Sequence, residues 1–200
     1  MRQGSAQVCR SVAHAVGTSG PIRRAAFHGE SSVIFLTTGT QLPFDRLVRA
    51  VDAWAEAAQP GCEIFGQVLS PPEAPYRPRN FETRTRLSPA EYAEIFEKAR
   101  LIVSHAGMGT ILTALTRGKQ ICIMPRQVKY GEHRSDHQLA TVERLGAHPG
   151  LHKARDEHDL AGCLDRALAE GESLQIATID PFAAADFSDR LRAFILSTEK

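Results

Sequence analysis

The sequence predicts a single α/β domain, with a parallel sheet and helices on both of its faces. Short apolar runs alternate with segments of helical periodicity through most of the chain, and this alternation is typical of parallel sheets. The apolar runs are continuous rather than alternating, which indicates strands buried on both faces. The length agrees, because 200 residues form one ordinary domain and would crowd two.

Residues 1–30 show no sustained period and are rich in Ser, Gly, Ala and Arg. We expect them to form a flexible N-terminal extension, with a short helix near residues 8–16 as an alternative. The domain itself is expected to occupy residues 31–200.

The first strand is predicted at residues 33–36, a run of β-forming side chains that ends in a tight turn. Pro43 suits the first turn of the following helix, whose apolar residues keep helical spacing to about Ala58. Residues 62–69 are the second predicted strand, and residues 81–87 are a weaker third.

The second half of the domain continues the same alternation. Ser88, Pro89 and Glu91 predict a helix start, with Ser as N-cap and Glu three residues later. Strands are expected at residues 101–103 and 121–124. Further helices are expected at residues 111–118, 135–145, 157–169 and 182–196.

Composition excludes several classes of protein. The chain is 42% hydrophobic and 24% charged, which is typical of a globular protein. Its 24 Lys and Arg nearly balance 23 Asp and Glu, so a bulk electrostatic attraction to nucleic acid is not expected. No apolar run approaches the roughly 18 residues that span a bilayer.

The cysteines predict neither a disulfide framework nor a zinc site. Cys9, Cys62, Cys122 and Cys163 are scattered, without a CxxC pair. Reduced thiols in a cytoplasmic protein are therefore expected. The N-terminal arginines lack an adjoining apolar segment, so they do not form a secretory signal.

Ligands of parallel α/β sheets bind outside the carboxyl ends of the strands. The loops after Leu36, Val103 and Met124 should therefore line one crevice. The first of these loops contains residues 37–40, which include Gly39. It is either a turn that needs glycine for its geometry or a cradle of N–H groups and hydroxyls for phosphate.

Residues 105–110 give a stronger signal. Gly107 and Gly109 let the backbone approach a ligand, and Thr110 stands where the next helix is expected to begin. Free N–H groups and the positive end of a helix dipole suit a diphosphate. His105 is a candidate donor to an anion or a ribose hydroxyl, or else a histidine satisfied within a turn. The spacing is neither GxGxxG nor a P-loop, which disfavours nicotinamide dinucleotides and ATP.

Residues 130–138 form a polar loop that enters a helix. Its carboxylates and imidazoles are metal-ligand types, but Gly131 and Ser135 indicate that the helix starts between the two histidines, which argues against a metal pair. We predict no metal. A solvated loop with a capping residue stays open, and the preferred interpretation is recognition of sugar hydroxyls by Glu132 and Gln138. Diphosphate and sugar recognition at one sheet edge together indicate a nucleotide-sugar site.

The segments VIFLTTGTQLPFDRLVRAVD, ARLIVSHAGMGTILTALTRGKQICIMPR and GEHRSDHQLA resemble the C-terminal domain of glycosyltransferase family 28. The resemblance covers roughly residues 31–200 and is specific because the three motifs occur in order. It is greatest to the stand-alone bacterial subunits of exopolysaccharide assembly. The chain is also similar to the catalytic subunit of the two-subunit N-acetylglucosaminyltransferase that acts on dolichol-diphosphate-linked sugar.

The resemblance implies the donor-binding, C-terminal half of a GT-B glycosyltransferase, a single Rossmann-like domain that takes a UDP-sugar as donor substrate without an obligatory metal or other cofactor. It also implies which residues contact the donor. These are Gly39, Thr40, His105, Gly107, Met108, Gly109, Thr110, Glu132, His137 and Gln138. Many relatives carry Glu where this chain has Thr113, which puts the ribose contact in doubt and makes Glu132 a candidate replacement.

The implied reaction is hexosyl transfer with inversion from a UDP-sugar to a lipid-linked acceptor. Because a GT-B enzyme needs a second half, the resemblance implies a membrane-associated acceptor-binding partner that recruits this cytoplasmic chain to the inner face of the plasma membrane. In isolation, a homo-oligomer is the alternative assembly. The catalytic base is not identified, and His105 and Asp45 are only weak candidates. The alternative function is that of a non-catalytic nucleotide-sugar-binding or regulatory subunit.

Overall fold

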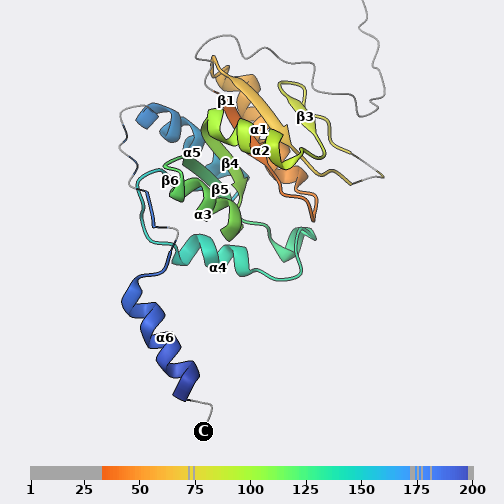
Figure 1. Ribbon diagram of the computed structural model, residues 1–200. Helices are drawn as coiled ribbons and strands as arrows, with labels where there is room; N and C mark the ends of the chain where they lie inside the picture. The colour runs from red at the N-terminus through yellow and green to blue at the C-terminus, as the bar shows by residue number, and fades with distance from the viewer. Residues whose placement is uncertain are drawn as a thin grey trace, which may run out of the picture. The chain divides into compact units, whose positions relative to one another are not determined.

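A computed structural model describes residues 33–71, 73, 75–171, 174, 176, 178–180 and 182–197. Six parallel strands form one sheet in the order β3-β2-β1-β4-β5-β6 (Figure 1). The strands are β1 (Val33–Thr37), β2 (Glu63–Gln67), β3 (Glu82–Arg84), β4 (Ala99–His105), β5 (Gln120–Met124) and β6 (Leu151–Lys153). The predicted α/β class with a parallel sheet is confirmed. The expectations for residues 1–30 lie outside the described residues.

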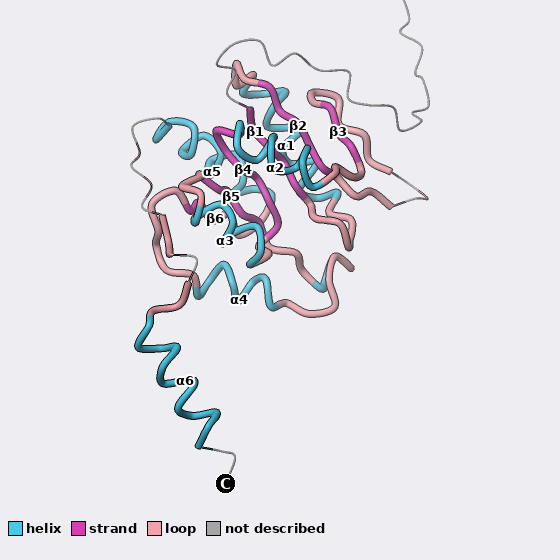
Figure 2. The backbone as a smooth tube through the Cα atoms, in the orientation of Figure 1, coloured by secondary structure: helices cyan, strands magenta, loops and turns pink. Residues whose placement is uncertain are grey.

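Six α-helices and one short 3-10 helix accompany the sheet in the described part of the chain (Figure 2). They are α1 (Asp45–Ala58), α2 (Pro89–Lys98), α3 (Met108–Thr116), η1 (Val128–Tyr130), α4 (His137–Arg144), α5 (Glu157–Glu170) and α6 (Ala185–Ser197). Each α-helix was predicted within a few residues. The strand β6 was not, because its three residues include only one apolar side chain, Leu151.

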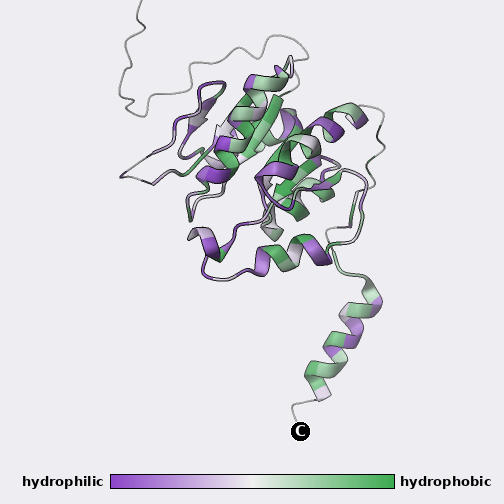
Figure 3. Cartoon of the chain, turned by 180° about the vertical axis from the view of Figure 1, so that it is seen from behind, coloured by the Kyte–Doolittle hydropathy of each residue, from purple (hydrophilic) through white to green (hydrophobic). Residues whose placement is uncertain are grey.

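Alternating side chains of the buried strands build two core layers. On β1, Ile34 and Leu36 belong to the cluster that contains α1 and α5, whereas Phe35 packs edge-to-face against Tyr92 and Phe96 of α2. This follows from the twofold period of a strand. Apolar residues accordingly concentrate in the central strands (Figure 3).

Two helix starts differ in how well the sequence predicted them. The capping box of α2 is confirmed, since Ser88 Oγ accepts from the Glu91 amide and Glu91 Oε2 accepts from the Ser88 amide. The start of α3 was predicted near Thr110, but the helix begins at Met108 with Gly107 as N-cap. The glycine loop is therefore partly the first turn of a helix.

The described cysteines are free thiols, and Cys122 on β5 contacts Cys163 on α5 with 2.6 Å between the Sγ atoms. None of the described helices is long and apolar enough to span a membrane. The large apolar side chains of α6 are exposed, among them Phe187 and Leu191.

Candidate site at the carboxyl edge of the sheet

The strand order has a topological switch point between β1 and β4. The chain passes from β1 to β2 on one side of the sheet, while β4 pairs with β1 on the other. Such a reversal is where open α/β sheets bind ligands, outside the carboxyl ends of the strands. The loops at residues 38–44, 106–107 and 125–136 all leave the sheet at this edge, as predicted.

His105, the last residue of β4, joins the two glycine loops. Gly39 has φ +76°, and a Cβ added there would lie 3.2 Å from His105 Cε1. A Cβ added to Gly107 would overlap His105 Nε2. Both positions therefore need glycine because the imidazole lies between them.

Burial and the nearby Arg126 cation lower the pKa of His105 to about 4, while the Thr37 backbone acts in the opposite direction. The imidazole is therefore neutral near pH 7. The predicted hydrogen bond to an anion or a hydroxyl would thus come from a neutral ring N–H rather than from an imidazolium.

The N-terminus of α3 faces the same loops. No side chain caps it, so the N–H groups of its first turn are available to an anionic ligand. A Cβ added to Gly109 would meet no atom within 4 Å among the described residues, and Met108 is exposed. Thr113, one turn later, donates its hydroxyl to the Gly109 carbonyl at 2.8 Å.

Arg126 connects the loop after β5 to the loop after β1. Its Nη2 donates to the carbonyls of Thr38 at 2.7 Å and Leu42 at 2.6 Å. Burial lowers the pKa of Arg126 to about 10, with Glu132 opposing the shift, so the side chain remains a cation at neutral pH. Its buried Nε has no hydrogen-bond partner among the described residues.

Glu132, predicted to bind sugar hydroxyls, lies in an ion-pair cluster. Its two carboxylate oxygens accept from Nε and Nη2 of Arg46 at 2.8 Å each, and Oε2 also accepts from the Gln127 amide at 3.0 Å. Arg46 Nη1 reaches Glu157 Oε2 at 2.6 Å. The structure thus gives Glu132 a role in anchoring the loop.

The predicted pair His137 and Gln138 divides between surface and interior. His137 is exposed, stacks edge-to-face on His133 with 4.4 Å between ring centroids, and contacts Ser135 Oγ. Gln138 is buried, and its Oε1 accepts from the Arg126 amide at 3.1 Å. Within the described residues, no group of three His, Cys, Asp or Glu side chains could hold a metal ion.

Asp45 begins α1, beside the loop that follows β1. Burial raises its pKa, while Arg49 and the Tyr76 amide act against that rise. Its Oδ1 is buried without a partner among the described residues. The side chain contributes to a hollow of about 390 Å³ that Tyr130 and Glu132 also line.

A hollow of about 470 Å³ opens beside the glycine loops. It is lined by Thr37, Gly39, Thr40, Gln67, Leu87, Pro89, Tyr92, Ala93, Phe96, Thr110, Thr113 and Arg117. Three predicted site residues, Gly39, Thr40 and Thr110, are among them. The space is within the usual range for a small-molecule pocket.

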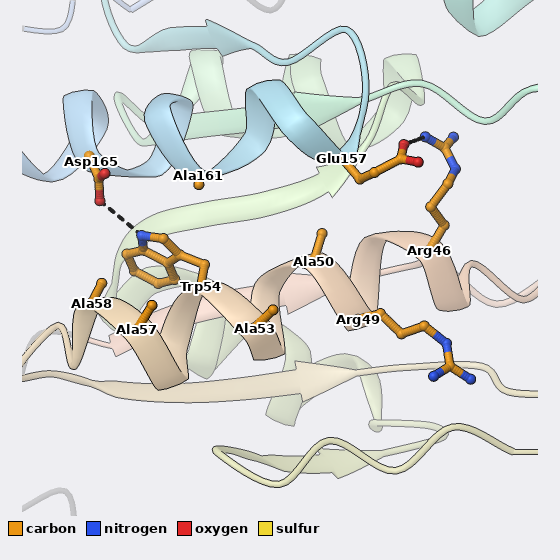
Figure 4. A pocket seen from close by; sticks show the side chains of 10 residues that line it. All are labelled: Arg46, Arg49, Ala50, Ala53, Trp54, Ala57, Ala58, Glu157, Ala161 and Asp165. Atoms are coloured by element: carbon orange, nitrogen blue, oxygen red, sulfur yellow. Dashed lines mark hydrogen bonds and ion pairs between the residues drawn. The ribbon is translucent and has the colours of Figure 1, made fainter.

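A larger hollow of about 830 Å³ lies between α1 and α5 (Figure 4). Alanines and Trp54 line it, and Trp54 Nε1 donates to Asp165 Oδ1 at 2.8 Å. It includes none of the predicted site residues.

Sequence reasoning did not single out Arg46, Gln67 and Arg126. Arg126 directly follows Pro125 at a strand end, and Gln67 is the polar last residue of an apolar strand. Polar residues at the carboxyl ends of buried strands were the available signal.

Several solved structures are similar to this chain. The glycotransferase of kitacinnamycin is 19% identical over 81% of this chain and 38% of that one, with a TM-score of 0.49. The solution structure of ALG13 is 16% identical over 80% of this chain and 94% of that one, with a TM-score of 0.46. SnogD from Streptomyces nogalater is 20% identical over 80% of this chain and 44% of that one, with a TM-score of 0.42. No curated protein sequence matches significantly.

The sequence motifs and the parallel sheet agree with a family model. Residues 33–191 match the glycosyltransferase family 28 C-terminal domain, and the chain belongs to that family.

Proposed function

We propose that this domain is the donor-binding catalytic subunit of an inverting hexosyltransferase and that its donor is a UDP-sugar. The observation that carries the proposal is the junction at the switch point between β1 and β4. There His105 lies between Gly39 and Gly107, next to the uncapped N-terminus of α3. Membership of a glycosyltransferase family supports transfer chemistry.

The residues at this junction suit a diphosphate leaving group. Negative charge grows on the departing UDP as the glycosidic bond breaks. N–H groups that are already oriented toward that charge stabilise the transition state without reorganising. In this proposal the N–H groups in the first turn of α3 supply those donors, and no metal ion takes part.

We propose that the acceptor site and the catalytic base lie outside residues 33–191, on a membrane-associated partner subunit. The acceptor is then a lipid-linked sugar of exopolysaccharide or glycolipid assembly. The chain spans only 38% of the length of the kitacinnamycin enzyme and 44% of that of SnogD. The exposed Phe187 and Leu191 of α6 are candidate contacts for the partner.

Calorimetric titration with UDP, UDP-GlcNAc and UDP-glucuronic acid tests donor binding. The decisive variant is Gly109→Asp, because a side chain there meets open space and an acidic residue suits a helix N-terminus. The fold should persist while the added charge repels a diphosphate. Gly109→Asn has the same size without the charge and serves as the matched control. Equal UDP affinity of the two variants would refute a diphosphate site at α3.

The alternative of a non-catalytic binding subunit is favoured by one observation. Thr113, where the family resemblance implies Glu in many relatives, uses its hydroxyl within α3 and offers no carboxylate to a ribose. Sugar transfer from a labelled UDP-sugar, measured with the co-expressed acceptor subunit, separates the two. UDP binding without any turnover would support the regulatory role.

A further inference from the structure

Resting on the proposed UDP-sugar site, we propose that Gln67 is a specificity-determining residue that reads the nucleobase of the donor. Its side-chain Oε1 accepts a hydrogen bond from the imide N–H of a uracil-type base held in the 470 Å³ hollow.

Gln67 lies at the sheet edge where the ligand is expected. It ends β2 and pairs in register with Thr37 at the end of β1, about 4.8 Å away, the usual spacing of strands. The proposed diphosphate junction, where His105 lies between Gly39 and Gly107, is on the side of β1 that pairs with β4. The hollow that Gln67 lines also reaches Gly39, Thr40 and Thr110, so a nucleoside held there would lie next to a diphosphate at the glycine loops.

The side-chain oxygen of Gln67 lacks a hydrogen-bond donor among the described residues. The residue is only 4% exposed. A buried acceptor without a partner is unfavourable and rare in native proteins. Gln67 also lines the hollow, so a ligand there can supply the missing donor.

The walls of the hollow suit a nucleoside. Leu87 and Tyr92 offer an apolar and aromatic surface for a planar ring, whereas Thr110 and Thr113 offer hydroxyls. None of the lining residues is acidic. A carboxamide presents an acceptor and a donor side by side, which matches the adjacent imide N–H and carbonyl of uracil.

Gln120, whose side-chain oxygen and nitrogen both have hydrogen-bond partners, provides a comparison within the same sheet. It is 5% exposed and begins β5. Its Nε2 donates to the Gly171 carbonyl at 3.1 Å, and its Oε1 contacts His152 Nε2 at 3.2 Å. The two glutamines are similarly buried, yet of these two only Gln67 has an acceptor left over among the described residues.

The test compares wild type with Gln67→Met by calorimetric titration of UDP, 3-methyl-UDP and 2′-deoxy-UDP. The 3-methyl base lacks the imide proton and keeps the ribose and the diphosphate. Wild type should bind UDP about tenfold more tightly than 3-methyl-UDP, the usual effect of one buried hydrogen bond. Gln67→Met should bind UDP about tenfold more weakly and lose the distinction between the two ligands.

Thermal unfolding without ligand gives an independent readout. Methionine has nearly the volume of glutamine and removes the buried acceptor that has no donor among the described residues. Gln67→Met should therefore unfold at the same temperature as wild type or higher, whereas the control Gln120→Met should unfold lower. A fall in the Tm of Gln67→Met equal to that of Gln120→Met would overturn the assignment of an unmet acceptor.

Two further results would overturn the inference alone and leave the donor site intact. One is that Gln67→Met still binds 3-methyl-UDP more weakly than UDP by the same factor as wild type. The other is that wild type binds 2′-deoxy-UDP more weakly than UDP whereas Gln67→Met binds the two equally, which would assign the ribose hydroxyl as the partner of Gln67. Failure of wild type to bind any of the three nucleotides would refute the proposed function together with the inference.

Discussion

Arg46 connects α1, α5 and the loop after β5 through one guanidinium. Its side chain is 12% exposed, and those of Glu132 and Glu157 are 9% and 28% exposed. It also donates to the Pro125 carbonyl at 2.9 Å and lies 4.6 Å from the centroid of the Tyr130 ring. Replacing Arg46 with Met keeps most of the aliphatic volume and removes every one of these polar contacts.

Arg46→Met should lower the free energy of unfolding by a large amount for one substitution near the protein surface. Removing one partner of a buried ion pair costs about 3–5 kcal/mol, because the remaining charge is left without compensation. Glu157 is partly hydrated, so we expect the lower end, about 3 kcal/mol. For a domain of this size that corresponds to a fall in Tm of about 6–12 °C.

Urea unfolding, followed by circular dichroism, measures this difference at constant m-value. Arg155→Met is the matched control, since Arg155 is 83% exposed and pairs with Asp159 at the protein surface, where such an ion pair contributes little to stability. The double variant Arg46→Met/Glu132→Gln should be at least about 1 kcal/mol more stable than Arg46→Met, because it also removes the Glu132 carboxylate that has lost its ion-pair partner. A loss in Arg46→Met no larger than in Arg155→Met would refute the reasoning.

Three other predictions concern the site and the acid response. Gly107→Ala should lose about 1–3 kcal/mol of stability and bind UDP more weakly, because the added Cβ overlaps His105; stability and affinity like those of Gly109→Ala would contradict it. Burial would raise the pKa of Asp52, but hydrogen bonds from Tyr76, Asn80 and Arg79 outweigh burial and lower that pKa. The ionised carboxylate therefore stabilises the folded state. This contribution is present above about pH 4 and is lost as the pH falls further. Asp52→Asn should cost about 2 kcal/mol at pH 7 and flatten the acid limb of a stability profile; a limb as steep as in wild type would count against Asp52 as its cause. Burial lowers the pKa of His105 to about 4, so the unfolded chain binds a proton at this residue at a higher pH than the folded chain does. The free energy of unfolding should therefore fall as the pH drops from about 6.5 to 4. His105→Gln should remove this pH dependence, and an unchanged pH dependence would exclude His105 as its source.

Local sequence signals determined much of the fold. Continuous apolar runs predicted the central strands because a strand covered by helices on both faces buries every side chain. Ser88 and Glu91 predicted the start of α2 because a capping box involves only four neighbouring residues. The glycines at residues 39, 107 and 109 marked the carboxyl edge of the sheet because the ends of parallel strands share one side. By contrast, β6 carries a weak signal and forms by pairing with β5.

The tertiary structure alone decided which polar groups remain available to a ligand. Glu132 had the chemistry of a sugar ligand, but Arg46, 86 residues away in sequence, occupies its carboxylate. Gln138 similarly accepts from a backbone amide, while Gln67, which no motif marked, keeps a buried acceptor unpaired among the described residues. The physical reason is distance along the chain. Helix caps, turns and strand patterns depend on neighbouring residues, whereas the partner of a buried polar atom depends on strand order and on which helices meet across the sheet.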